Sequence, residues 1–179
     1  MRDVMLDLET FNNTPDSVIC AIGAVEFDPE TGALGQTLYR VVDPQSCVEL
    51  GMTIGVDTVK WWLQQGDEAR AAITKDGGVP IKSALRDFAS FIENMDCSAK
   101  HVRVWGNGAG FDNVILASAY RAADMSVPWQ FYNDRCFRTL KALTPEVEYE
   151  KPSVAHHALE DAKAQALHAV KLLKLVGTE

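Results

Sequence analysis

The sequence lacks the usual marks of a membrane or secreted protein. None of its apolar runs approaches the length of a membrane span. Its N-terminus has no basic segment followed by an apolar core, so we expect no signal peptide. The four cysteines are scattered and form neither a Cys-x-x-Cys pair nor a zinc spacing: Cys20, Cys47, Cys97 and Cys136. They indicate reduced, buried thiols in a cytoplasmic protein with no membrane partner.

Positive charge is also scarce. The chain has 17 Lys and Arg against 25 Asp and Glu, which gives a net charge of −8. This balance argues against a basic protein that coats nucleic acids. It does not exclude an enzyme in which metal ions and a few local cations meet phosphate groups.

The length of 179 residues, 47% of them hydrophobic, suits one domain over residues 1–179. Apolar patterning predicts strands over 3–9, 18–27, 34–42 and 102–105, with an extended piece near Phe131. It predicts helices from Asp57 or Thr58 onward and over 67–73, 81–95, 111–123, 136–143 and 157–175, with loops over 43–55 and 144–152. Strands first and then mostly helices indicate an α/β domain with a mixed sheet covered by helices.

The first predicted strand carries two acids. Alternation along a strand divides its side chains between two faces: Val4, Leu6 and Leu8 on one, Met5, Asp7 and Glu9 on the other. Two carboxylates side by side on an apolar strand repel each other and lose hydration. A hard divalent metal with oxygen ligands explains the pair, and a strand end with solvated acids is the simpler alternative.

Two further acids stand where they could meet this pair. Asp112 follows a short strand and a glycine-rich turn and opens a helix. Such junctions lie at one end of a sheet, where α/β proteins build their sites. Asp161 lies in the first turns of the final helix, off its apolar face. Asp is also favoured at helix N-termini because it complements the dipole, so each acid alone has a structural interpretation.

Three motifs occur in order: Asp7-Leu8-Glu9-Thr10, then Asn107-Gly-Ala-Gly-Phe-Asp112, then His156-His-Ala-Leu-Glu-Asp161, which fits His-x-Ala-x-x-Asp. Together they resemble the DEDDh exonucleases of the ribonuclease-H-like superfamily. The resemblance spans nearly the whole chain and is nearest to small phage and bacterial exonucleases that are exodeoxyribonuclease VIII-like or similar to ribonuclease T. It implies a ribonuclease-H-like mixed β-sheet flanked by helices.

The resemblance also implies a chemistry. Asp7, Glu9, Asp112 and Asp161 would bind two divalent metal ions, and His156 would be the general base. Two such ions can stabilise the attacking and the leaving oxygen of a phosphodiester displacement, and oxygen-only ligands suit Mg²⁺ or Mn²⁺. The implied activity is a 3′→5′ exonuclease that acts on single-stranded DNA or RNA and releases nucleoside 5′-monophosphates.

The residues leave several alternatives open. A catalytically inert nucleic-acid-binding subunit could use the same fold, although the intact acid set argues against it, and the resemblance is compatible with a homodimer. His157 is a second candidate for the base. If the final helix includes His157, then His157 and Asp161 share a face, and His156 meets Asp161 only from the loop before the helix. The family spacing favours His156.

The expected substrate contacts are Thr10, Phe11, Trp61, Asn107 and Arg138. Trp61 and Trp62 are neighbours on a helix and point in different directions, so at most one is expected to stack on a terminal base. Core packing is the alternative for both, and more so for Trp62. Arg138 contacts phosphate or forms a structural ion pair.

Overall fold

The computed structural model describes residues 1–74, 77–95, 98–150, 152 and 156–177. Its strands are β1 (Arg2–Thr10), β2 (Ile19–Phe27), β3 (Leu34–Val41), β4 (Val102–Gly106) and β5 (Asp134–Cys136). Its helices are α1 (Pro44–Val48), α2 (Val56–Leu63), α3 (Asp67–Thr74), α4 (Ile81–Glu93), α5 (Asp112–Ala122), α6 (Phe137–Leu143) and α7 (Ala158–Val176). Two short 3₁₀ turns are η1 (Ala99–His101) and η2 (Phe131–Asn133).

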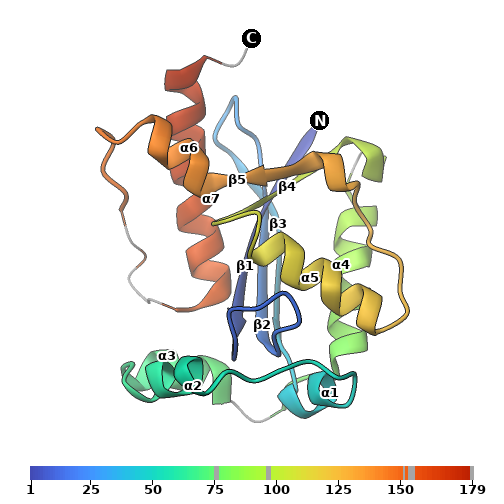
Figure 1. Ribbon diagram of the computed structural model, residues 1–179. Coiled ribbons are helices and arrows are strands. Elements are labelled where there is room, and N and C mark those ends of the chain that lie inside the picture. Colours follow the sequence, from blue (N-terminus) through green and yellow to red (C-terminus); the bar gives the residue numbers. More distant parts are fainter. Residues whose placement is uncertain (75–76, 96–97, 151, 153–155, 178–179) are drawn as a thin grey trace.

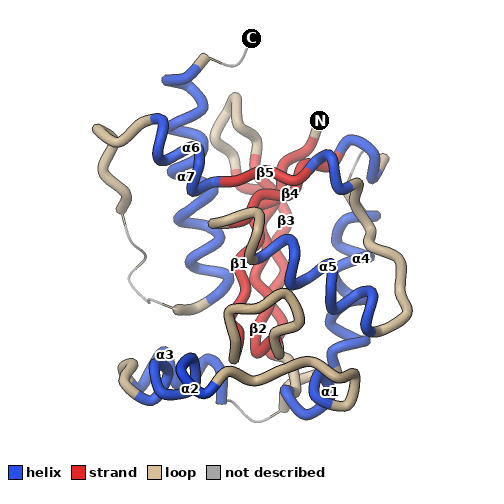
Figure 2. Tube along the Cα trace, viewed as in Figure 1, coloured by secondary structure: helices blue, strands red, loops and turns tan. Residues whose placement is uncertain are grey.

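The five strands form one mixed sheet in the order β3-β2-β1-β4-β5. β2 pairs antiparallel with β1 and β3, whereas β4 runs parallel to β1 and β5 runs parallel to β4. Figure 1 shows α6 and α7 on one side of the sheet and α4 and α5 on the other, with α2 and α3 across one end of it. Figure 2 shows the same arrangement by element type. The predicted ribonuclease-H-like fold class is confirmed.

The alternation of β1 separates two cores, as predicted. Val4, Leu6 and Leu8 pack with the apolar face of α4 and with α5. Met5 lies on the opposite face and packs with α7. On this second face Asp3 is also buried, and it accepts hydrogen bonds from the side chains of Arg103 and Trp105 on β4. The buried Asp3 carboxylate therefore has hydrogen-bond partners within the protein. Asp7 and Glu9 lie on the same face, toward the other end of the strand.

A close approach between β2 and α7 fixes where the last helix begins. A Cβ atom on Gly23 would lie 2.2 Å from the backbone carbon of Ala158, so only glycine fits there. Gly23 is also the register partner of Asp7 in the β1–β2 pair. The helix that carries Asp161 therefore starts directly over the strand pair that carries Asp7.

Three local predictions are wrong. Residues 43–55 contain the five-residue helix α1, which Asp43 caps and Pro44 opens. α2 begins at Val56 with Gly55 as its N-cap, which lies two residues before Asp57 and three before Thr58, the two predicted caps. Phe131 begins a 3₁₀ turn, and the extended piece is β5, three residues later. The remaining strands and helices begin and end within two residues of their predicted bounds.

Two findings bear on the predictions from composition. Across the part of the chain that the structure describes, no helix is long and apolar enough to cross a membrane. Cys20 and Cys47 are buried and Cys136 is half-buried, all as free thiols, while Cys97 lies outside the described residues.

Candidate active site

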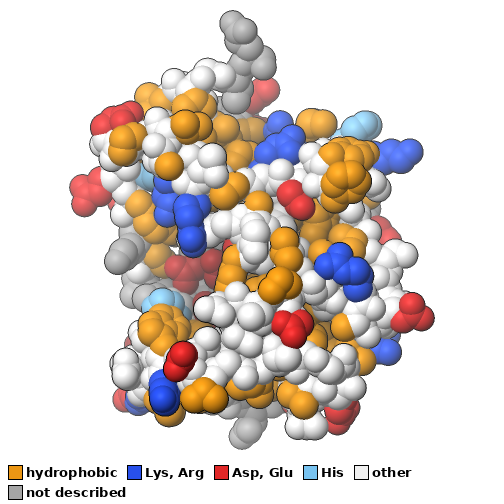
Figure 3. All heavy atoms as spheres, viewed as in Figure 1, with side chains coloured by type: hydrophobic (Ala, Val, Ile, Leu, Met, Phe, Trp, Pro, Cys, Tyr) orange, Lys and Arg blue, Asp and Glu red, His pale blue; other side chains and the backbone are white. Residues whose placement is uncertain are grey.

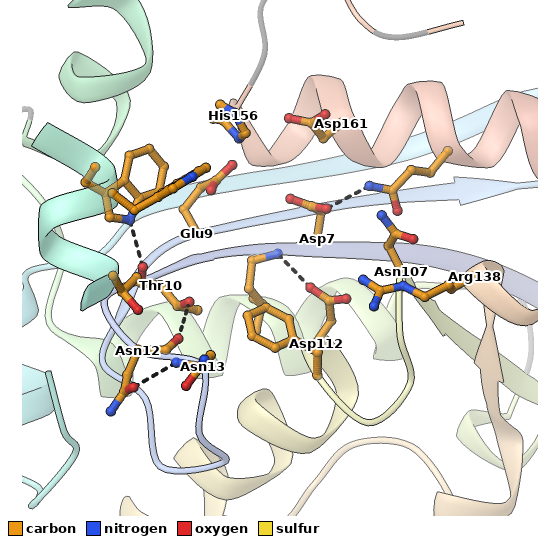
Figure 4. Close-up of a pocket in the computed structure, with 16 residues that line it drawn as sticks. Asp7, Glu9, Thr10, Asn12, Asn13, Asn107, Asp112, Arg138, His156 and Asp161 are labelled. Carbon is orange, nitrogen blue, oxygen red and sulfur yellow. Dashed lines mark hydrogen bonds between the residues drawn. The ribbon is translucent and has the colours of Figure 1, made fainter. Parts of the chain in front are cut away.

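The predicted site residues meet in one pocket of about 430 Å³. It opens at the ends of β1 and β4, between α2, α5 and the start of α7, and Figure 3 shows acidic side chains in a hollow on this face. Figure 4 shows how its lining side chains point toward one another. The lining includes Asp7, Glu9, Thr10, Asn12, Asn13, Thr58, Trp61, Trp62, Asn107, Phe111, Asp112, Arg138, His156, Asp161 and Gln165.

Three carboxylates converge at the centre of the pocket. Asp7 and Glu9 come from alternate positions of β1, and Asp161 comes from the first turn of α7. Each offers a carboxylate oxygen, and these three atoms all lie within 4.8 Å of one another. Without a compensating cation this arrangement is unfavourable, because like charges are held together away from water.

The fourth acid enters from the opposite side. Asp112 is the first residue of α5, is buried, and accepts a 3.2 Å hydrogen bond from the backbone N–H of Leu8. Gly106 makes this approach possible, since a Cβ there would lie 3.0 Å from the Asp112 side chain and 2.4 Å from Asn113 Oδ1. After burial, the charge of Asp112 is the next largest cause of the raised pKa of Asp7, so Asp112 interacts electrostatically with the three converging carboxylates.

The acids hold protons more tightly than ordinary carboxyls do. Burial, followed by the charges of Asp161 and Asp112, raises the pKa of Glu9 to about 8. Burial raises the pKa of Asp112 to about 7, although the hydrogen bond from Leu8 works against the rise. Burial is also the main cause of the raised pKa values of Asp7 and Asp161. These shifts describe a site that is short of positive charge, as a cation-binding site is before its ion arrives.

The two histidines have different surroundings. α7 begins at Ala158 with His157 as its N-cap, so His156 lies in the preceding loop, with a positive φ of 62°. His156 lines the pocket and meets the ring of Trp61 edge-on, with 5.0 Å between ring centroids. His157 is not among the residues that line the pocket, and its ring stacks on that of Tyr39 with 4.3 Å between centroids. Of the two arrangements that the sequence left open, the structure has the one in which His156 reaches the acids from the loop.

The tryptophans divide into one buried and one exposed ring. Trp62 is buried, and its Nε1 donates a 2.9 Å hydrogen bond to the carbonyl of Thr10, which ties α2 to the end of β1. Trp61 is 42% exposed and its ring meets that of Trp62 edge-on. Trp61 is therefore the ring that remains available at the pocket, with Trp62 as its support.

Polar side chains complete the wall near Asp7. Gln165, one turn after Asp161 on α7, donates a 2.7 Å hydrogen bond to Asp7 Oδ1. Gln165 Oε1 and Asn107 Oδ1 are buried and have no hydrogen-bond partner among the described residues. Arg138 also lines the pocket and is exposed, and its charge opposes in small part the burial that raises the pKa of Asp112. Among the described residues, no carboxylate lies within salt-bridge distance of Arg138.

One predicted contact lies elsewhere, and several were missed. Phe11 does not line this pocket; it packs against the buried core residues beneath it. The reason is the irregular register after Glu9, which ends the simple alternation of β1. Asn12, Asn13, Thr58, Phe111 and Gln165 line the pocket without having been predicted. Only Gln165 carried a signal in the sequence, because it lies four residues after Asp161 and so shares its helix face.

The family of the chain follows from a comparison with family models. Residues 2–173 match the 3′-5′ exoribonuclease Rv2179c-like domain. The chain belongs to this family. The predicted enzyme class, a 3′→5′ exonuclease, is thereby confirmed. No curated protein matches the chain.

Solved structures with the same fold are DEDDh exonucleases and related enzymes. The nuclease domain of 3′hExo, a DEDDh family member bound to rAMP, is 15% identical with a TM-score of 0.65, over 97% of this chain and 92% of that one. A 3′-exonuclease that recognises the 3′ end of a histone mRNA stem-loop is 14% identical with a TM-score of 0.65, over 97% and 81%. The zinc-bound E. coli ExoI–ssDNA complex is 17% identical with a TM-score of 0.65, over 98% of this chain but only 40% of that one. At these identities the likeness is one of fold.

Proposed function

We propose that the chain, acting as one exonuclease domain over residues 1–179, removes nucleotides from the 3′ end of single-stranded RNA and releases nucleoside 5′-monophosphates with the help of two divalent metal ions. The observation that carries the proposal is the meeting of four acids from β1, α5 and α7 with His156 in one pocket. The family description, an exoribonuclease, favours RNA over DNA.

The donor set fits hard divalent ions. Asp7, Glu9, Asp112 and Asp161 would hold them, and every one of these ligands is an oxygen donor, as Mg²⁺ and Mn²⁺ prefer. When bound, the ions supply positive charge to the scissile phosphate and to its leaving oxygen. The raised pKa values of the acids and the unpartnered oxygens of Asn107 and Gln165 support the fit, since both features are relieved by a cation or by the polar groups that accompany it.

The protein residues would divide the remaining work. His156, placed at the pocket by its loop, would accept the proton of the attacking water. Trp61 offers an exposed face on which the terminal base can stack, and Arg138 offers a cation for a phosphate. Thr10, Asn12 and Asn13 lie at the end of β1, where they can hydrogen-bond to the sugar of the last nucleotide.

Matched oligonucleotides test the proposal. RNA and DNA of one sequence, each labelled at the 5′ end, are incubated with the protein and Mn²⁺ or Mg²⁺, and the products are resolved by length. We expect a ladder that shortens from the 3′ end, faster on RNA, with nucleoside 5′-monophosphates as the released product. Faster shortening of DNA would overturn the substrate assignment. Binding without any cleavage would indicate an inert nucleic-acid-binding subunit.

A further inference from the structure

Two aromatic side chains stand exposed outside the pocket. Phe131 is 81% exposed and Tyr132 is 57% exposed, and their rings meet edge-on with 5.5 Å between centroids. Burying rings of this size is strongly favourable, so a pair left in water on one short turn marks a surface that binds something.

The turn that carries the pair is firmly anchored. Asn133 is buried and donates a 2.9 Å hydrogen bond from Nδ2 to the carbonyl of Lys100 in η1. The next residue, Asp134, accepts hydrogen bonds from the side chains of Trp129 and Asn113. Both aromatic rings are therefore presented by a backbone that is held on two sides, and little ordering remains to be done when a partner binds.

Two cations and one carboxylate lie near the pair. Arg135 donates hydrogen bonds to the carbonyls of Tyr132 and Asp134, and Lys100 is exposed on η1 against which η2 packs. Neither cation forms an ion pair with a carboxylate among the described residues. Asp134, which precedes Arg135, accepts hydrogen bonds from Asn113 and Trp129, so one negative charge stands beside the two cations. In a chain of net charge −8, two such cations beside exposed rings suit a partner that is both aromatic and anionic.

The exposed pair is connected to the pocket by β5. This edge strand has three residues and spans about 10 Å at about 3.3 Å per residue. η2 precedes it, and α6 follows it with Arg138, which lines the pocket, and Lys141 one turn later. Figure 1 shows this segment running across the molecule, and Figure 3 shows hydrophobic and basic side chains over it on the same face as the acidic hollow.

We propose that Phe131 and Tyr132 stack on bases of the substrate strand a few nucleotides upstream of its 3′ end, with Arg135 and Lys100 near its phosphates. The inference rests on the proposed function and names a second contact for the same substrate. Stacking accepts any base, which suits an enzyme that must pass a whole sequence through one site.

Length-dependent binding tests this surface. The affinity of 5′-labelled, non-cleavable RNAs of 2 to 10 nucleotides is measured by fluorescence polarisation, with Ca²⁺ in place of Mg²⁺. The proteins are the wild type, F131A/Y132A, K100Q, and the control Leu175→Ala, which removes a similarly exposed apolar side chain from the far end of α7. We expect the wild type to gain affinity up to about six nucleotides. F131A/Y132A should lose about tenfold or more of that gain, and K100Q should lower the salt slope by about one.

The outcomes separate this inference from the function on which it rests. If the wild type binds no RNA with a free 3′ end at any length, the proposed function fails. If the wild type gains affinity with length and F131A/Y132A keeps the whole gain with an unchanged melting temperature, only the upstream contact is wrong. Conversion of a wild-type dimer into a monomer by F131A/Y132A, with RNA binding unchanged, would also overturn the inference and assign the surface to a second copy of the chain.

Discussion

Gln165 holds Asp7 in place: its buried Nε2 donates a 2.7 Å hydrogen bond to Asp7 Oδ1 across 158 positions of sequence. Gln165 and Asp161 lie one turn apart on α7, so a single helix supplies one acid and orients another. The hydrogen bond also lowers the pKa of Asp7, against the larger effect of burial. Gln165 thus favours the charged form of Asp7, which is the form that binds a cation.

The first prediction follows from this bond. Gln165→Leu keeps the size of the side chain and removes the donor, so Mn²⁺ affinity should fall by about 10–100-fold while the fold is kept. Calorimetric titration with Mn²⁺ measures the affinity, and circular dichroism checks the fold. Gln36→Leu, an exposed position on β3, is the control and should bind Mn²⁺ as the wild type does. An unchanged affinity in Gln165→Leu would show that Asp7 needs no such support.

The second prediction concerns the contact between β2 and α7. Gly23→Ala places a methyl group 2.2 Å from the Ala158 backbone, so the start of α7 must move. We expect a loss of about 1–3 kcal/mol of unfolding free energy and a fall in activity, because Asp161 moves with the helix. Gly66→Ala is the control, since nothing lies within 4 Å of its added Cβ. Chemical denaturation measures both variants, and equal effects would contradict the account.

The third prediction separates the two histidines. His156→Ala should lower the turnover number by about 10²–10⁴-fold, as expected for the loss of a general base. His157→Ala should lower it much less, but it should reduce the melting temperature because His157 caps α7 and stacks on Tyr39. Single-turnover rates across pH, together with thermal melts, distinguish the effects. The reverse ranking of rates would make His157 the base.

The fourth prediction is a pH dependence of the metal-free protein. Glu9 and Asp112 have folded-state pKa values raised to about 8 and about 7, whereas the unfolded chain releases these protons near pH 4. The folded state therefore binds more protons through this interval, and its stability must fall as pH rises. The lowered pKa of His168 has the opposite effect, but only below its ordinary value of 6.5.

The melting temperature without metal should accordingly fall between pH 6.5 and 8.5. Glu9→Gln should flatten this fall, because it removes one of the groups whose proton is lost. Saturating Mn²⁺ should flatten it as well, because the ion takes the place of the protons. Glu30→Gln, in the exposed β2–β3 turn, is the matched control and should follow the wild type. A melting temperature that rises over the same interval would contradict the assigned shifts.

Much of the fold could be predicted because its elements repeat strong local patterns. β2 is a nearly continuous apolar strand, β1 alternates between two faces, and α4 has a clear apolar stripe. α1 escaped prediction because five residues are too short for periodicity to register, although Asp43 and Pro44 are ordinary start signals. β5 escaped because three half-buried residues carry no alternation, and only its pairing with β4 makes it a strand.

Site residues could be predicted from the sequence where the chemistry requires a particular residue type. They could not be predicted where tertiary contacts determine which residues line the pocket. Four acids and a histidine in ordered motifs carry their own signal. Phe11 was expected at the pocket, but the register of β1 is irregular after Glu9, so the residues that follow do not continue the alternation between faces. The sequence does not reveal that shift. Asn12 and Asn13 were missed because loop asparagines are common for reasons of turn geometry alone.

Three proteins, compared with and without a divalent cation, show whether the carboxylates act through the ion. Hydrolysis of a 5′-labelled single-stranded RNA is measured for the wild type, for Asp7→Asn, and for the control Asp87→Asn, whose carboxylate pairs with Arg40 at the surface. We expect the wild type and Asp87→Asn to shorten the RNA from its 3′ end only when Mn²⁺ or Mg²⁺ is present, and Asp7→Asn to lose most turnover although its fold is intact. Wild-type rates in Asp7→Asn, or undiminished hydrolysis in a chelator, would contradict this expectation.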